Sequence, residues 1–124
     1  MLNKLKTLAI IGSTGSIGTQ TLLVVKNNVR RFRVVLLSAD SNHTLLYKQA
    51  KEFKPKYVVI NTESGYRFLK KNLSGSNTRV FCGADALCGL LLEKKINLVV
   101  SAIVGSAGLL PTISAICGGK DVAL

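Results

Sequence analysis

The sequence has no tryptophan, only two prolines and one histidine, and its hydrophobic runs are short. No apolar run reaches the roughly 18 residues of a membrane span, so we expect no membrane partner. The N-terminus enters an apolar strand pattern almost at once, which leaves no room for a transit peptide. That apolar run ends in glycines and not at the small-residue cleavage site of a signal peptide. We therefore expect a soluble, cytoplasmic protein.

Acidic residues are also scarce, with six Asp and Glu against 17 Lys and Arg. No two of the six carboxylates have the close spacing of a metal-ligand pair on one loop, so we assign no metal ligand to this chain. The six are Asp40, Glu52, Glu63, Asp85, Glu93 and Asp121.

The resulting formal charge of +11 allows two interpretations. One is a nucleic-acid partner, and the other is a solvated basic surface that also attracts phosphorylated small molecules. The cations are scattered and do not alternate with aromatic residues as a base-stacking surface would require. We therefore expect no nucleic-acid partner, and keep a nucleic-acid-binding module as an alternative that affinity at moderate salt would test.

The three cysteines are odd in number and form no CxxC pair, and only His43 could assist them as a metal ligand. This set excludes a structural zinc site of the usual spacing. We predict that Cys82, Cys88 and Cys117 are reduced thiols buried in the core of a cytosolic protein.

The length of 124 residues and the hydrophobic content of 48% predict one domain with a substantial core. Apolar strand runs without inside–outside alternation are separated by helical patterns, which is typical of a parallel sheet buried on both faces. We therefore predict an α/β fold with a doubly wound parallel sheet, a Rossmann-like NAD(P)-binding domain. The expected strands are 7–11, 33–39, 57–60, a weak strand centred on Val80, 96–102 and 121–124; the expected helices are 16–28, 42–53, 64–73, 84–95 and 109–117.

Two of these helices show an apolar face at helical spacing. In the first, the expected face consists of Ile17, Thr21, Val24 and Val25. In the second it consists of Leu45, Leu46, Ala50 and Phe53.

The stretch "GSTGSIG" follows the first strand and opens the first helix, where this fold binds phosphate. We expect Gly12 to allow a sharp exit from the strand, Gly15 to let a pyrophosphate approach the backbone, and Gly18 to let the helix pack closely on the sheet. A merely structural glycine-rich turn is the alternative. No lysine follows in the P-loop position, which disfavours ATP hydrolysis.

The same turn offers hydrogen-bond donors at the positive end of the helix. The hydroxyl groups of Thr14 and Ser16 are two of them. We also expect the backbone N–H groups of Gly15, Ser16 and Ile17 to point outward.

The end of the second strand, "SADSNH", should choose between NAD and NADP. Asp40 would accept a hydrogen bond from the ribose 2′-hydroxyl of NAD, whereas Ser41, Asn42 and His43 favour a 2′-phosphate. Ordinary turn and N-cap roles would explain Asp40 and Asn42 equally well. A second loop, "SAIVGSAGLLPT" at 101–112, has the small residues expected beside the cofactor's ribose and nicotinamide. These residues alone leave the choice open.

The segments "GSTGSIGTQTLLVV" at 12–25 and "AIVGSAGLLPT" at 102–112 together resemble the N-terminal domain of 1-deoxy-D-xylulose 5-phosphate reductoisomerases. "FRVVLLSADSN" at 32–42 and "KPKYVVI" at 54–60 fit the same register, so the resemblance covers nearly the whole chain. It implies that residues 1–124 form the NADPH-binding domain of a cytoplasmic, homodimeric enzyme. Such an enzyme uses NADPH and a divalent metal to convert 1-deoxy-D-xylulose 5-phosphate to 2-C-methyl-D-erythritol 4-phosphate in non-mevalonate isoprenoid biosynthesis.

The resemblance also implies roles for single residues. Some members of the family have glycine in place of Asp40 and lysine in place of Ser41, whereas Asn42 matches. The metal ligands and the substrate-phosphate site would lie beyond Leu124, so we assign no catalytic residue here and expect the chain to be inactive alone. Phosphate binding is implied for Thr14, Gly15, Ser16 and Ile17, and contact with the 2′-phosphate for Asp40, Ser41 and Asn42.

Two alternatives from other functional classes stay open at this point. The lack of catalytic acids would suit a stand-alone nucleotide-sensing module. Asp40 would suit a different NAD-dependent Rossmann dehydrogenase, which tight NAD and weak NADP binding would indicate.

Overall fold

The computed structural model describes residues 5–103, 111–112, 115–116 and 118–123. Six strands form one sheet in the order β4-β3-β2-β1-β5-β6, and every pair is parallel. The chain therefore builds outward from β1 on one side and then returns to β1's other side, as predicted for a doubly wound sheet. The strands are β1 Lys6–Ile11, β2 Phe32–Ala39, β3 Tyr57–Ile60, β4 Arg79–Cys82, β5 Leu98–Ser101 and β6 Asp121–Ala123.

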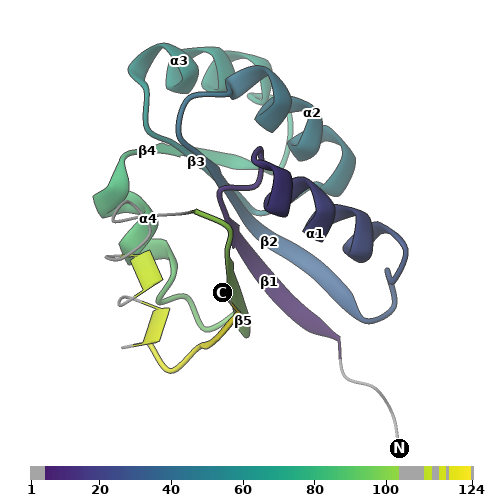
Figure 1. Cartoon of the computed structure of the whole chain (residues 1–124). Coiled ribbons are helices and arrows are strands. Elements are labelled where there is room, and N and C mark those ends of the chain that lie inside the picture. The colour runs from purple at the N-terminus through teal and green to yellow at the C-terminus, as the bar shows by residue number, and fades with distance from the viewer. Residues whose placement is uncertain (1–4, 104–110, 113–114, 117, 124) are drawn as a thin grey trace, which may run out of the picture.

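Helices cover both faces of the sheet (Figure 1). On one face lie α1 Ser16–Lys26, α2 His43–Phe53 and α3 Glu63–Asn72. On the other lies α4 Ala84–Leu90, together with a C-terminal stretch in which Pro111, Thr112, Ala115 and Ile116 are helical. The rest of the helix expected at 109–117 lies outside the described residues.

The inner strands send side chains into two separate cores, one on each face of the sheet. In β1, Leu8 and Ile10 pack against α1, α2 and α3, whereas Ala9 and Ile11 pack on the α4 side. Because both faces are buried, every position of the strand favours an apolar side chain. This arrangement explains why the strands show no polar alternation in the sequence.

The exposed and buried sides of α1 differ from the expectation. Gly18, Leu22 and Val25 face the sheet, whereas the side chains of Ile17 and Val24 are 52% and 54% exposed. The close contact of Gly18 with the preceding loop, described below, sets the rotation of the helix. The helix also ends at Lys26, two residues earlier than expected.

The fourth helix is shorter than the expected span of 84–95. After Leu90 the hydrogen bonds tighten: the N–H of Leu92 donates to Gly89 O (3.2 Å) and that of Glu93 to Leu90 O (3.0 Å). Such three-residue bonds end an α-helix. Leu91 and Ile96 follow the end of the helix but are still buried in the core. Their apolar spacing therefore led to the prediction of a longer helix.

The prediction of buried cysteines is wrong for the two that the structure describes. Cys82 is exposed and Cys88 is half-buried, and both are free thiols. Cys82 ends β4, which is an edge strand of the sheet formed by the described residues. Cys117 lies outside the described residues.

Candidate functional site

A tight turn joins β1 to α1 and is held against the end of β2. The N–H groups of Gly12 and Ser13 both donate to Ser38 O, at 3.0 and 2.8 Å. Gly12 has a φ of 81°, in the region that side chains disfavour, and a Cβ there would lie 2.8 Å from Ile103 Cγ1. Gly12 thus provides the sharp exit from the strand that the sequence predicted.

Gly18 brings the first turn of α1 directly onto this loop. A Cβ at Gly18 would lie 2.2 Å from Gly12 O and 2.6 Å from Ser13 Cα. Both atoms belong to the backbone, so neither can rotate away. Only glycine permits the close packing of the helix that the sequence predicted at this position.

A buried pair of polar side chains locks the loop to α2. Ser13 Oγ donates to Gln49 Oε1 (2.8 Å), and Gln49 Nε2 donates to Ser13 O (2.9 Å). The two residues are 0% and 6% exposed. Sequence reasoning missed this pair, although a glutamine between Leu46 and Ala50 on a buried helix face was a signal for it.

We expect replacement of Gln49 by leucine to destabilise the chain. The change leaves Ser13 with a buried hydroxyl and carbonyl that have lost their partner, which costs about 1–3 kcal/mol in the free energy of unfolding. Urea unfolding followed by circular dichroism measures it. The exposed neighbour Lys48 supplies the control, since Lys48→Gln should change the value by less than about 0.5 kcal/mol. Equal stability of Gln49→Leu and wild type would show that the two hydrogen bonds between Gln49 and Ser13 do not stabilise the chain.

Within the described part of the chain, no side chain caps the N-terminus of α1. Its N-cap Gly15 forms no side-chain hydrogen bond, and its first turn contains no acid. The prediction for Gly15 itself needs correction, because its N–H donates to Gly12 O (3.3 Å). The N–H groups of Ser16 and Ile17 are in the first turn, where α-helices lack internal acceptors. These two groups are the donors that the turn presents.

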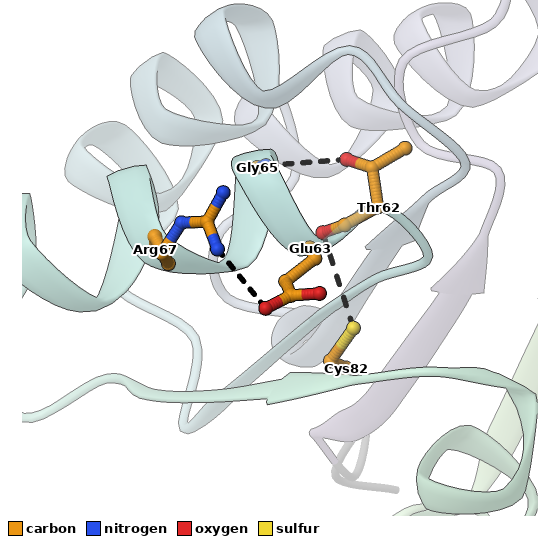
Figure 2. A network of polar contacts seen from close by, with 5 residues as sticks. All are labelled: Thr62, Glu63, Gly65, Arg67 and Cys82. Atoms are coloured by element: carbon orange, nitrogen blue, oxygen red, sulfur yellow. Dashed lines mark hydrogen bonds and ion pairs between the residues drawn. The ribbon is translucent and has the colours of Figure 1, made fainter.

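The N-terminus of α3, in contrast, is filled by the protein itself (Figure 2). Thr62 Oγ1 accepts from the N–H of Gly65 (3.2 Å), and Glu63 pairs with Arg67 at 3.0 Å. The thiol of Cys82 donates to Thr62 O (3.9 Å). Such capping removes the donors and the positive potential that an anion would need. The short helix α4 also lacks a side-chain cap, but it has Asp85 in its first turn, whereas the first turn of α1 has no acid.

The segment after β2 combines turn roles with exposed polar groups. Asn42 Oδ1 accepts from the N–H of Leu45 (3.2 Å) and caps α2, as the structural interpretation of this residue proposed. Asp40 Oδ1 accepts from Asn61 Nδ2 (3.2 Å), and Asp40 O accepts from the N–H of Asn61 (3.0 Å). Asp40, Ser41 and Asn42 are all exposed.

A pocket of about 330 Å³ opens at the carboxyl ends of the strands. It brings together Thr14, Gly15 and Asp40 among the predicted residues; Ser16, Ile17, Ser41 and Asn42 are not in its wall. Asn61, which sequence reasoning missed, lines it as well. Of the second loop, Ala102, Ile103 and Pro111 contribute, and residues 104–110 lie outside the described part. The full lining is Gly12, Thr14, Gly15, Ser38, Ala39, Asp40, Asn61, Ala84, Leu87, Ala102, Ile103 and Pro111.

Basic side chains gather at the opposite edge of the sheet. Lys6, Lys94 and Lys120 line a hollow of about 500 Å³ at the amino ends of the strands. Nearby, the ammonium group of Lys56 lowers the pKa of Lys95, because two like charges lie side by side. Positive charge therefore stands away from the pocket, whose described lining contains no lysine or arginine.

One tyrosine at this opposite edge also has a shifted acidity. Burial raises the pKa of Tyr57, and the hydrogen bond from its hydroxyl to Glu93 Oε1 (2.9 Å) raises it further. The neutral phenol is thus favoured in the folded chain. Tyr57 lies at the amino end of β3 and does not line the pocket.

The sequence model of 1-deoxy-D-xylulose 5-phosphate reductoisomerase matches residues 8–124. The chain belongs to this family. The reductoisomerase of Porphyromonas gingivalis is 45% identical over 119 residues, which are 96% of this chain and 31% of that protein. The reductoisomerase of Buchnera aphidicola is 43% identical over 122 residues, again 31% of its length. The chain thus spans about a third of the curated reductoisomerases that it matches.

Solved reductoisomerase structures show the same fold. The enzyme from Zymomonas mobilis in complex with NADPH has a TM-score of 0.90 and 39% identity to this chain. The match covers 98% of this chain and 32% of the solved chain. A reductoisomerase in complex with NADPH, fosmidomycin and magnesium has a TM-score of 0.91 and 34% identity. The match covers 97% of this chain and 30% of the solved chain. In both comparisons the match covers about a third of the longer solved chain.

The described residues contain neither a metal-binding cluster nor a membrane-spanning helix. No group of three His, Cys, Asp or Glu side chains that could hold a metal ion occurs among residues 5–103 and the described C-terminal positions. Within the same ranges, no helix combines the length and the apolar character needed to cross a bilayer.

Proposed function

We propose that this chain binds the NADPH of a 1-deoxy-D-xylulose 5-phosphate reductoisomerase. The observation that carries the proposal is the uncapped N-terminus of α1, which opens at the point between β1 and β5 where the sheet order reverses. Doubly wound sheets bind dinucleotides at this point, with the pyrophosphate on the helix N-terminus. The family membership supports the same cofactor, because the Zymomonas mobilis relative was solved with NADPH.

The residues of the turn fit a pyrophosphate on physical grounds. Gly15 has no side chain to cover the helix end, and the closest atom to an added Cβ would be Gly12 O at 3.7 Å. In this proposal the N–H groups of Ser16 and Ile17 donate to phosphate oxygens, and the Thr14 hydroxyl adds a third donor. Asp40, Ser41 and Asn42 then face the adenosine ribose.

For the whole protein we propose the activity of the family. NADPH supplies the hydride that reduces the rearranged sugar phosphate, and a divalent metal completes the active site, in keeping with the magnesium complexes among the structural relatives. This chain contributes cofactor binding, and the metal ligands and the substrate-phosphate site belong to other segments. We further propose that the whole protein is a cytoplasmic homodimer, as the family resemblance implies.

Titration calorimetry of the chain with NADPH and with 2′-phospho-ADP-ribose tests the cofactor proposal. The second probe lacks the nicotinamide, so it measures the phosphate and adenosine sites alone. We expect saturable binding of both with one molecule per chain. If neither probe binds to a chain that circular dichroism shows to be folded, the proposed function is wrong.

A further inference from the structure

One side of α1 is apolar and largely exposed. Ile17 and Val24 are 52% and 54% exposed, and Thr21 between them is half-buried. The spacing of four and then three residues places the three side chains in one line along the helix. Thr21 Oγ1 donates to Ile17 O (2.8 Å), so the hydroxyl hydrogen is already used within the helix. We call Ile17, Thr21 and Val24 the α1 seam.

The other sides of α1 already have partners. Leu22 and Val25 face the sheet, and Leu23 and Lys26 line a hollow together with residues of α2. The helix α2 packs over β2 and β3, whereas β5 lies on the other side of β1. The α1 seam therefore faces away from α2 and toward β5.

The sheet loses its cover in the same direction. Ile10, Val100 and Ala123 stand in register on β1, β5 and β6, so they share the face on which α1 packs. Ile10 is 0% exposed, Val100 is half-buried and Ala123 is exposed. On the opposite face Val99 of β5 is fully buried in a core that includes Ala115. The strand β5 is thus covered well on the opposite face and only in part on the face of α1.

The handedness of the crossovers explains the difference. The order β1 to β4 runs one way across the sheet, and its right-handed crossovers place α1, α2 and α3 on one face. The step from β5 to β6 runs the opposite way, so its crossover lies on the other face. Another crossover in that direction would also lie there. Cover for β5 and β6 on the face of α1 must come from a segment outside this alternation.

The whole protein has chain to provide such a segment. This chain spans 31% of the Porphyromonas gingivalis relative, which leaves about two thirds of that protein for other parts. Parallel sheets in α/β proteins are covered on both faces.

We infer that the α1 seam, with the β5 and β6 residues on the same face, is the docking surface for a helix from the remaining two thirds of the whole reductoisomerase. The four–three spacing of the α1 seam is the pattern along which two helices interlock their apolar side chains. Ile17 begins the seam beside the glycine turn, so the docked helix borders the dinucleotide site. The inference goes beyond the cofactor proposal and does not depend on it.

The replacement Val24→Glu tests the inference when it is made both in this chain and in the whole protein. In this chain the position is exposed and glutamate suits a helix, so we expect the melting temperature to change by less than about 2 °C. In the whole protein the carboxylate would be buried under the docked helix, and we expect a decrease of about 5 °C or more. Differential scanning calorimetry measures all four proteins.

The matched control is Leu23→Glu in the same two proteins. Leu23 is next to Val24 and 58% exposed, but it faces α2. Its replacement should therefore change the melting temperature by the same amount in this chain and in the whole protein. If the whole protein with Val24→Glu does not fold, Val24→Ser replaces it and should lower the melting temperature of the whole protein alone.

Two results would overturn the inference. One is an equal effect of the Val24 variants in this chain and in the whole protein, which would leave the α1 seam open to solvent in both. The other is a dimer of this chain in sedimentation velocity that Val24→Glu dissociates, which would assign the surface to a second copy. Neither result bears on NADPH binding, which the titrations test separately.

Discussion

Replacing Gly18 with alanine is expected to lower the free energy of unfolding by about 3 kcal/mol or more, one of the largest effects available to a single methyl group. The new Cβ would lie 2.2 Å from Gly12 O and 2.6 Å from Ser13 Cα, and both are backbone atoms that cannot rotate away. Relief requires α1 to move away from the sheet, which would open the core around Leu22 and Val25. Urea unfolding followed by circular dichroism measures the loss.

Gly89 provides the matched control for this experiment. It lies within α4, and a Cβ there would meet no atom within 4 Å. Because alanine favours a helix over glycine, Gly89→Ala should stabilise the chain by about 0.5–1 kcal/mol. A Gly18→Ala chain as stable as wild type would show that the helix does not need this close approach.

Replacing Gly15 with valine is expected to weaken NADPH binding by about 100-fold while leaving the fold intact. Gly15 has an extended backbone, with φ −78° and ψ 178°, that valine adopts readily. Its side chain would stand over the N-terminus of α1 and block the donors of Ser16 and Ile17. Loss of two hydrogen bonds to a charged phosphate is sufficient for a change of this size.

Titration calorimetry with NADPH measures the affinity, and thermal unfolding shows whether the variant is folded. Gly75 offers a control in the loop between α3 and β4, where a Cβ would meet nothing within 4 Å. Gly75→Val should bind NADPH as wild type does. Unchanged affinity in a folded Gly15→Val chain would place the pyrophosphate elsewhere.

The sheet could be predicted from the sequence because its strands are buried on both faces. A short apolar run between two helical patterns, such as 57–60, indicates a buried strand. The strand β3 has the predicted bounds. The end of α4 could not be predicted, since Leu91 and Ile96 continue the apolar spacing after the helix has ended. The exposure of Cys82 depends on β4 being an edge strand, which is a property of the whole sheet.

For the site, local sequence predicted the glycine turn but not the partners that other segments bring to it. Gly12 and Gly18 have the roles that their spacing indicated, because those roles depend on backbone contacts within the motif. Gln49 contacts Ser13 of the turn from 36 residues away, and Asn61 contacts Asp40 from 21 residues away. No local sequence pattern predicts such contacts. Whether the turn binds phosphate stays a prediction for the titrations.

The position of β5 beside β1 has a consequence for how fast this chain reaches its folded state. Strands β1 to β4 pair in the order in which they are synthesised, so their contacts form between close neighbours along the chain. Thr7 and Asn97, in contrast, meet across 90 residues. Closing so long a loop is slow, because its entropy is lost before the new contacts repay it. We therefore expect the β1–β4 half to form first and the addition of β5 to limit the folding rate.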